Sequence, residues 1–293
     1  MIATAQKSMY PVLKRLWQTS FGDSAACTDF LFGHIPPGNI LVWLEDKTIA
    51  SMLVWYPVEL VLPDGIIPCA YMFGFNTHPL RRGQGIGARL LDGMHTYLKS
   101  KGYEAVLLAP ASESLFGYYA RYGYETLFNV KTATLTAGEL RHPASPCTLL
   151  SRGLDSLCDE RGEFFGGDRL FARWDKSFLR LISEDCKFRS GNVLRFACGD
   201  ANGYVAYYPI GEGKIRITEL GVPPRRVNDV LYALYKRSGV HTFEIRLPED
   251  YQFNAENKYP VLPFVMIRWY DREKWMPRVE ALPHPPYFAH ILD

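Results

Sequence analysis

The sequence lacks the features that mark a membrane protein, a secreted protein or a nucleic-acid-binding protein. It has no apolar run of about 18 residues, and its start lacks the charged and apolar regions of a secretory signal. The 33 lysines and arginines nearly balance 31 aspartates and glutamates, which gives a formal net charge of +2. No basic stripe is therefore available to neutralise a nucleic-acid backbone. We expect a cytoplasmic protein that binds neither nucleic acid nor membranes.

The sequence also lacks a metal-binding pattern. Its six cysteines and seven histidines are scattered along the chain, without a C-x-x-C pair or a histidine at metal-ligand spacing. We therefore expect no metal site. The cysteines are predicted to be reduced and structural.

What the chain does have is length and apolar content. Its 293 residues are 47% hydrophobic and 14% aromatic, enough to bury the cores of two domains of ordinary size. Periodicity in the first half predicts short helices, an antiparallel meander and then a strand, crossover helix and strand. The expected elements are two helices within 8–33 with Asp23 or Ser24 capping the second, strands at 40–44, 49–56, 58–62 and 69–77, a helix from Gly85 to before Gly102, a strand at 104–109, a helix near 114–122 and strand-like segments within 128–136.

The second half repeats this order at low identity. A proline-bearing stretch, 138–151, is predicted to be a linker between the halves. The repeated elements are a hairpin of 193–198 and 204–208, a strand at 215–220, a helix at 227–236 and a strand at 243–247. We therefore predict an α/β (α+β mixed sheet) fold in two similar domains, residues 1–140 and 141–293, each with a mixed, mostly antiparallel sheet flanked by helices.

A glycine-rich loop lies between a predicted strand and a predicted helix. Gly83, Gly85 and Gly87 allow close approach of a ligand to the backbone, and the first amides of the helix that follows have no intrahelical partners. Phosphate or pyrophosphate suits such a site, with Arg81 or Arg82 adding a charged contact. The plain alternative is a turn that only packs the helix on the strand.

Two other phosphate-binding motifs fit the loop less well. A P-loop needs Lys followed by Ser or Thr after its last glycine, and Ala88-Arg89 stand there instead. A dinucleotide-binding G-x-G-x-x-A pattern is present, with Glu104 about 20 residues further on. Glu104, however, begins its predicted strand instead of ending it, and the preceding strands resemble hairpins.

The loop resembles motif A of the GNAT superfamily of N-acetyltransferases, in which Arg or Gln is followed after two residues by Gly-x-Gly or Gly-x-Ala. Arg82, Gly85 and Gly87 match this pattern. The resemblance implies that loop amides bind the pyrophosphate of acetyl-CoA and that the preceding strand pairs with its pantetheine. The implied cofactor-binding residues are Phe75, Asn76, Thr77, Arg82, Gly83, Gln84, Gly85, Ile86, Gly87, Ala88, Ser112 and Tyr119, with Ser112 standing where many members have asparagine.

A second motif supports the resemblance. The family places a tyrosine four residues before Gly-Phe or Gly-Tyr, and Tyr119 stands in that position before Gly123-Tyr124. The resemblance implies that Tyr119 is the general acid, since a phenol can protonate a leaving thiolate. By itself, Tyr119 would be interpreted as a core aromatic residue. The general base stays open between His78, Glu45, a water relay and the terminal carboxylate of Asp293.

The whole layout resembles the tandem-GNAT enhanced intracellular survival acetyltransferases, without their sterol-carrier-like third domain. The resemblance implies a catalytic GNAT domain in 1–140 that binds acetyl-CoA and releases coenzyme A. The matching loop of the second half, 221–226, lacks the glycines and contains prolines, so 141–293 is expected to be a degenerate GNAT-like domain that packs on the first and walls the acceptor cleft.

The implied activity is transfer of an acetyl group to a primary amine by direct attack in a ternary complex. The acceptor is a small-molecule or peptide amine, and homo-oligomers are compatible with the sequence. The alternatives are an aminoacyl or peptidyl transferase of the same tandem fold and a non-catalytic acyl-CoA sensor.

Overall fold

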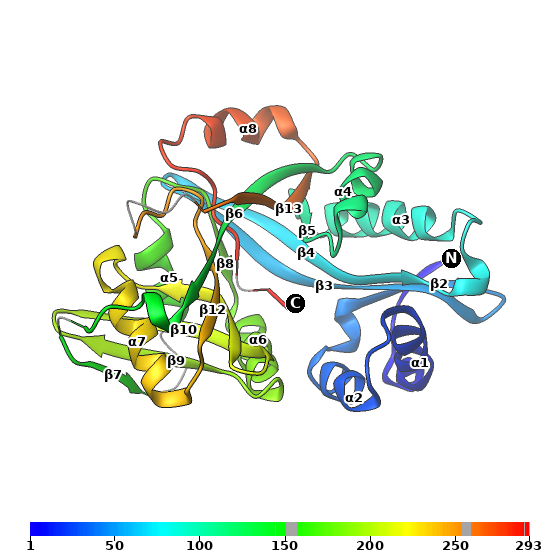
Figure 1. Ribbon diagram of the computed structural model, residues 1–293. Coiled ribbons are helices and arrows are strands. Elements are labelled where there is room, and N and C mark those ends of the chain that lie inside the picture. The colour runs from blue at the N-terminus through cyan, green and yellow to red at the C-terminus, as the bar shows by residue number, and fades with distance from the viewer. Residues whose placement is uncertain (144, 151–156, 254–258, 290, 293) are drawn as a thin grey trace. The chain divides into compact units, whose positions relative to one another are not determined.

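The computed structural model describes residues 1–143, 145–150, 157–253, 259–289 and 291–292 (Figure 1). Spatial contacts divide the chain into two compact units. The first unit contains Met1–Glu59, Ile67–Glu125 and Met266–Arg272, and the second contains Leu60–Ile66, Thr126–Val265 and Glu273–Asp293. Each unit is therefore built from more than one stretch of the sequence. The predicted domain boundary at residue 140 stays a prediction from the sequence.

The described chain has strands, α-helices and short 3-10 helices in a mixed α/β arrangement. In order they are β1 (Ile2–Thr4), η1 (Lys7–Met9), α1 (Tyr10–Phe21), α2 (Ala25–His34), η2 (Pro37–Asn39), β2 (Ile40–Glu45), β3 (Thr48–Leu62), β4 (Gly65–Thr77), η3 (Pro79–Arg81), α3 (Ile86–Ser100), β5 (Ala105–Leu108), α4 (Glu113–Ala120), β6 (Glu125–Thr136), η4 (Ala137–Glu139), β7 (Cys147–Leu150), α5 (Leu157–Phe165), β8 (Phe171–Trp174), α6 (Lys176–Phe188), β9 (Asn192–Cys198), β10 (Ala201–Gly211), β11 (Lys214–Gly221), η5 (Pro224–Arg226), α7 (Val227–Ser238), β12 (Thr242–Leu247), β13 (Val261–Trp269) and α8 (Arg272–Glu280).

The first unit is a mixed sheet with helices on both faces. Its strand order is β1-β2-β3-β4-β5-β13, with β4 and β5 parallel and β5 and β13 antiparallel. In Figure 1, α1 and α2 lie on one side of β2–β4, and α3 and α4 lie on the other. The predicted strand, crossover helix and strand are confirmed as β4, α3 and β5. The single long strand β3 replaces the two strands predicted at 49–56 and 58–62.

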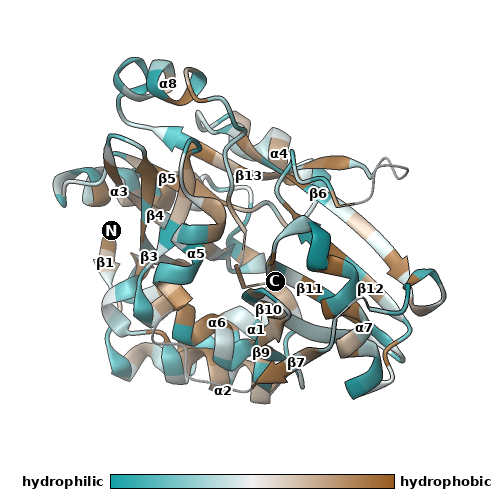
Figure 2. Cartoon of the chain, turned by 90° about the vertical axis from the view of Figure 1, so that its left-hand side faces the viewer, coloured by the Kyte–Doolittle hydropathy of each residue, from teal (hydrophilic) through white to brown (hydrophobic). Residues whose placement is uncertain are grey.

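The helices of the first unit begin and end where local chemistry predicts. Gly22 ends α1 in the left-handed conformation (φ +76°), a conformation with little cost for glycine. Ser24 caps α2, because its side chain accepts a hydrogen bond from the Cys27 amide. On α3, the buried face carries Leu90, Leu91, Met94 and Leu98, which pack against β-strand residues such as Ala70 and Met72. Figure 2 shows hydrophilic and hydrophobic stretches on the helices.

The second unit repeats the order of the first. Its strand order is β6-β12-β11-β10-β9-β7, and its parallel pair, β11 and β12, is joined through α7. The hairpin of β9 and β10 is antiparallel, as predicted. A core of buried aliphatic residues on α7, including Val230, Leu231 and Leu234, packs with Ile217 and Phe243 of the sheet. The predicted internal repeat is therefore present in the structure.

Two predictions for the segment between the halves are wrong. The stretch 138–151 contains strand β7, which pairs antiparallel with β9. Cys147 and Cys198 are directly opposite in this pairing and form a disulfide, with their Cα atoms 4.2 Å apart. The expectation of six reduced cysteines was wrong for these two because sequence spacing does not reveal which residues face each other across strands. Cys27, Cys69, Cys158 and Cys186 form no disulfide within the part of the chain that the structure describes.

Each unit is completed by a strand from the other half of the sequence. Strand β6 follows α4 along the chain but pairs antiparallel with β12 in the second unit. Strand β13 follows β12 along the chain, yet its Met266–Trp269 segment pairs with β5 in the first unit. The last strand of each half of the sequence therefore pairs within the unit that the other half mainly forms. No helix among the described residues is long and apolar enough to cross a membrane.

Candidate active site

The parallel strands β4 and β5 separate halfway along β4. Their pairing ends at Tyr71 opposite Leu107, whereas β4 continues to Thr77 and β5 stops at Leu108. Within the described residues, no other strand borders β4 on the β5 side. The outer part of β4 therefore has backbone N–H and C=O groups on an open edge, which an extended ligand can pair with as a strand would.

Gly74 shapes this open part of β4. Its φ of +60° is in the left-handed region, and an added Cβ would lie 2.3 Å from the Trp17 ring of α1. No side chain fits there, so glycine is required both by conformation and by contact. Gly74 was not predicted from the sequence, although a glycine within an aromatic strand is a signal for a bulge or a close approach.

The predicted residues Phe75, Asn76 and Thr77 form the end of β4. Asn76 is buried, and its side chain accepts from Ser20 at 3.2 Å and donates to the Gly74 carbonyl at 2.9 Å. Because the Asn76 amide group is used within the protein, its side chain ties β4 to α1. What the three residues offer a pantetheine chain is therefore their backbone.

The glycine-rich loop follows directly and leads into α3. Gly83 and Gly85 both have positive φ, +76° and +70°. Gly85 is the N-cap of α3, and it has no side chain with which to bond the first amides. The first backbone hydrogen bond of the helix runs from the Arg89 amide to the Gly85 carbonyl. The amides from Ile86 to Ala88 thus have no intrahelical acceptor, the arrangement that binds anions at a helix N-terminus.

Gly87 brings this helix close to the end of β4. A Cβ at Gly87 would lie 3.1 Å from Phe75 Cζ and 3.2 Å from Thr77 Oγ1, closer than most such contacts. Glycine here allows the first turn of α3 to pack on β4 beside the open edge. The structure thus brings the predicted residues of strand and loop together. Of these residues, Ile86 and Asn76 have buried side chains.

Three arginines and one glutamate surround the loop. Arg82 donates from Nε to the Thr77 carbonyl at 3.1 Å, which folds the loop back on the strand end. Arg89 and Arg81 approach Glu45 at 3.2 and 3.9 Å. One carboxylate cannot neutralise three guanidinium groups, so the loop has an excess of positive charge that favours a phosphate ligand.

The candidate bases differ in what their side chains contact. Glu45 pairs with Arg81 and Arg89 at the loop, so its carboxylate is engaged there. His78 Nδ1 accepts from the Leu80 amide at 3.3 Å and so caps η3. Asp293 lies outside the described residues. The general base therefore stays unassigned.

Tyr119 lies at the end of α4, where the chain closes in a Schellman motif. The Tyr124 amide donates to the Tyr119 carbonyl at 3.3 Å, and the Gly123 amide donates to the Ala120 carbonyl at 3.0 Å. Gly123 supplies the left-handed conformation that the motif needs, with φ +78°. The rings of Tyr119 and Tyr124 meet edge to face with centroids 5.8 Å apart. The tyrosine and glycine spacing recognised in the sequence is thus the spacing of this helix cap.

The environment of Tyr119 is largely apolar. Its side chain is 8% exposed and packs in the same core as α3. Burial raises the pKa of its phenol to about 12. Ser112, in contrast, is exposed and is the N-cap of α4 without bonding a helix amide, its hydroxyl lying 3.1 Å from that of Ser114.

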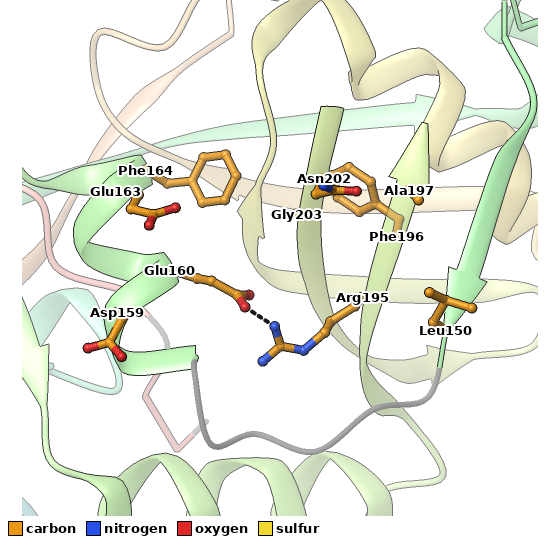
Figure 3. Close-up of a pocket in the computed structure, with 10 residues that line it drawn as sticks. All are labelled: Leu150, Asp159, Glu160, Glu163, Phe164, Arg195, Phe196, Ala197, Asn202 and Gly203. Carbon is orange, nitrogen blue, oxygen red and sulfur yellow. Dashed lines mark hydrogen bonds and ion pairs between the residues drawn. The ribbon is translucent and has the colours of Figure 1, made fainter. Parts of the chain in front are cut away.

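The second unit contains a separate pocket of about 450 Å³ (Figure 3). Phe164 and Phe196 line it together with the acidic residues Asp159, Glu160 and Glu163, and Figure 3 shows Glu160 paired with Arg195. Asp159 and Glu160 belong to the first turn of α5, where the helix dipole stabilises carboxylates without any ligand. We assign no ligand to this pocket.

The loop of the second unit that matches the glycine-rich loop is built differently. Its arginines are used within the protein, since Arg226 pairs with Asp200 and with Asp229 of the first turn of α7. Pro223 and Pro224 supply no amide hydrogens. An aspartate thus occupies the helix start where an anionic ligand would bind in the first unit.

Comparisons with known proteins agree with this geometry. Residues 1–127 match the family described as an acetyltransferase (GNAT) domain. No curated protein sequence matches the chain. The structure is similar to that of a probable N-acyltransferase from Enterococcus faecalis V583, with a TM-score of 0.73, 18% identity, and 92% of this chain and 72% of that chain covered.

Two further structures have a similar fold. Eis1 from Mycobacterium abscessus matches with a TM-score of 0.71 and 16% identity over 94% of this chain and 75% of that chain. A GCN5-related N-acetyltransferase from Kribbella flavida matches with a TM-score of 0.68 and 16% identity over 92% and 72%. Residues 1–127 thus match the model of a GNAT acetyltransferase domain, in a chain whose fold is similar over more than nine-tenths of its length to those of Eis1 and a probable N-acyltransferase.

Proposed function

We propose that the protein is an N-acetyltransferase that transfers the acetyl group of acetyl-CoA to a primary amine. The observation that carries this proposal is the open edge of β4, which leads directly into a helix start with unpaired amides and surplus positive charge. The edge suits the pantetheine arm of coenzyme A, and the helix start suits its pyrophosphate. The GNAT match over residues 1–127 supports the same ligand.

The proposed reaction is a direct attack in a ternary complex. The neutral amine nitrogen forms a bond with the thioester carbonyl carbon, the carbon–sulfur bond breaks, and the amine gives up a proton to water or a base. The carbonyl oxygen gains negative charge in the transition state, and in this proposal a backbone amide near the open end of β4 stabilises it. The reaction is accelerated because both reactants are held in line and because of this electrostatic contact.

In this mechanism Tyr119 stabilises the leaving thiolate. A thiol has a pKa of about 8.5, and burial raises the pKa of the Tyr119 phenol to about 12. Complete proton transfer across this gap of about 3.5 costs roughly 5 kcal/mol, at about 1.4 kcal/mol for each pKa unit. A hydrogen bond from the neutral phenol to the developing thiolate avoids most of that cost. The general-acid role is thus proposed in the form of a strong hydrogen-bond donor.

We further propose one coenzyme A site per chain, in the first unit, because the matching loop of the second unit has prolines and ion-paired arginines instead of free amides. The proposed acceptor is an aminoglycoside, a polyamine, a peptide amine or a small metabolite.

The test combines binding with turnover. Acetyl-CoA at about 100 times its dissociation constant should stabilise the protein by about 2.7 kcal/mol. Arg82→Ala should weaken that effect, whereas Arg15→Ala, on the exposed side of α1, should not. Thiol release from acetyl-CoA is then followed with a panel of amines. Stabilisation without thiol release for any amine would indicate the acyl-CoA sensor, and no stabilisation at all would refute the proposal.

The aminoacyl or peptidyl transferase is tested with the same protein. Such an enzyme would release no thiol from acetyl-CoA but would transfer an amino acid from aminoacyl-tRNA. The nearly balanced charge of the chain argues against it, because binding tRNA draws on an excess of basic residues.

A further inference from the structure

A buried histidine connects α3 to the turn that follows α4, the helix that carries Tyr119. His95 is on the core side of α3 and is 5% exposed. Its Nε2 lies 3.3 Å from the Tyr124 hydroxyl, and its Nδ1 lies 3.2 Å from the Tyr270 hydroxyl at the end of β13. The imidazole thus lies between two phenols from separate parts of the first unit.

The hydrogen bonds of this group have a defined direction. Burial, with a smaller contribution from the charge of Arg268, lowers the pKa of His95 to about 3. The imidazole is therefore neutral at physiological pH, so that one ring nitrogen donates and the other accepts. Tyr124 is the more deeply buried phenol and needs an acceptor for its hydrogen, whereas Tyr270 is partly exposed. We therefore assign Tyr124 as the donor to Nε2, and Nδ1–H as the donor to Tyr270.

Tyr124 also supports Tyr119 structurally. It is bonded to the Tyr119 carbonyl through its amide and contacts the Tyr119 ring edge to face. A ring that is free to rotate or shift would not hold a neighbouring phenol in one place. Its hydroxyl bond to His95 removes that freedom, and the Tyr270 bond in turn fixes the imidazole.

We propose that His95 is a positioning residue for Tyr119, acting through the hydroxyl of Tyr124. The inference rests on the proposed function, since it concerns the phenol that stabilises the leaving thiolate. It adds a physical link between the two ends of the coenzyme A site. The helix whose first turn binds the pyrophosphate also carries the side chain that sets the phenol in line with the sulfur.

The first test deletes single hydroxyl or imidazole groups. Tyr124→Phe retains the ring and should lower kcat about tenfold, because small displacements of a reacting group are costly, with little change in KM for acetyl-CoA. His95→Leu should have a similar effect, and His95→Gln should recover most of kcat, because its amide oxygen can accept from Tyr124. Tyr97→Phe, which removes a hydroxyl from the same helix, is the matched control. The substrate is acetyl-CoA with the fastest amine of the panel.

The second test separates positioning from general stability. In a Tyr119→Phe background, adding Tyr124→Phe or His95→Leu should change the residual kcat by less than about twofold, because their effect passes through the missing phenol. The same tenfold loss in both backgrounds would overturn the proposal and make the group purely structural, as would an unchanged kcat in the single variants. Full turnover by Tyr119→Phe alone would instead refute the proposed role of Tyr119 itself, and the inference with it.

A spectroscopic measurement tests the hydrogen-bond direction without turnover. In ¹⁵N-histidine-labelled protein, with the His95 signals assigned through His95→Gln, the ring should be neutral, protonated on Nδ1 and insensitive to pH between about 5 and 8. Tyr124→Phe should change the tautomer ratio of His95, while Tyr97→Phe should leave it as it is. A His95 ring that titrates in this range, or is protonated on Nε2, would contradict the assignment.

Discussion

Burial of Tyr119 determines the protonation state of its phenol under assay conditions. Its pKa is raised to about 12 by the apolar core around it, so the phenol stays protonated over the whole practical range. Because this pKa is raised, the phenol keeps its proton as pH increases and loses it only above the pKa that it has in the folded protein. The alkaline limit of activity should therefore not come from this residue.

We predict that kcat rises as the amine acceptor loses its proton and shows no decline with an apparent pKa below about 10. The measurement is a pH profile of thiol release for the parent and for Tyr119→Phe, which should be slower by about 10² or more because it lacks the donor. The shape of the two profiles should be the same. A falling alkaline limb that disappears in Tyr119→Phe would show that the phenol titrates far lower than its burial indicates.

A second residue-scale prediction concerns the buried ion pair of the second unit. Arg161 donates from two nitrogens to Glu219, at 2.8 and 3.0 Å, and Tyr204 donates to the same carboxylate at 2.6 Å. Glu219→Gln leaves the Arg161 charge buried without its counter-ion, so the free energy of unfolding should fall by about 3–5 kcal/mol. Urea denaturation measures this change.

The control is a more exposed ion pair in the same unit. Glu244 pairs with Lys214 and Arg216 at partly exposed positions, and Glu244→Gln should cost less than about 1 kcal/mol because solvent screens such pairs. Equal losses for Glu219→Gln and Glu244→Gln would mean that the buried carboxylate gains no more from its partner than an exposed one does.

At the scale of elements, the loop before α3 combines strain with ligand binding. Gly85 has φ +70°, and a Cβ there would make only an ordinary contact with the Arg89 side chain at 3.9 Å; Gly102 after the same helix has φ +86°, and a Cβ there would meet nothing within 4 Å. Alanine at either position should lower the free energy of unfolding by about 1–2 kcal/mol, because both must adopt the left-handed conformation. Only Gly85→Ala should also weaken acetyl-CoA binding.

The measurement pairs a denaturation curve with an acetyl-CoA titration for each variant. Gly102→Ala, with its stability loss and intact binding, corrects for general destabilisation. If Gly85→Ala bound acetyl-CoA as tightly as Gly102→Ala, the loop amides would not be the pyrophosphate site.

The elements that local chemistry determines were predictable from the sequence. Helical spacing of apolar residues and the three glycines predicted α3 and its loop, and Ser24 and Gly22 marked the helix ends around residue 23. Strand β7 was not predicted because its four residues, which lie near prolines, show no clear alternation of apolar and polar side chains. Gly74 was missed because its requirement comes from Trp17, a contact that only the folded chain reveals. For the same reason, nothing in the sequence analysis linked His95 to Tyr124.

At the scale of the whole molecule, the exchange of strands β6 and β13 between the two units could not be predicted from the sequence. Strand β13 pairs with β5 although most of the second half lies between them in sequence. Local pattern predicts that a strand exists but not which edge it joins. The predicted repeat was right about the order of elements, while the last strand of each half belongs to the other unit.

This exchange leads to a prediction about fragments. Residues 1–140 lack β13 and should therefore leave the edge of β5 unpaired, so that this fragment alone is poorly folded and does not bind acetyl-CoA. Co-expression with residues 141–293 should restore a complex that does. The measurement is co-purification followed by an acetyl-CoA titration. Independent folding of 1–140 with full affinity would show that β13 is dispensable.

The position of β13 also matters while the protein is being made. Its residues 266–269 complete the sheet that carries the proposed coenzyme A site, yet they are synthesised after β6 to β12 of the second unit. A nascent chain on the ribosome thus has an incomplete first sheet until residue 269 has been synthesised and has left the ribosome. A premature stop codon even shortly before residue 266 would remove a strand from the N-terminal sheet, so any product truncated before this residue should lose activity together with stability.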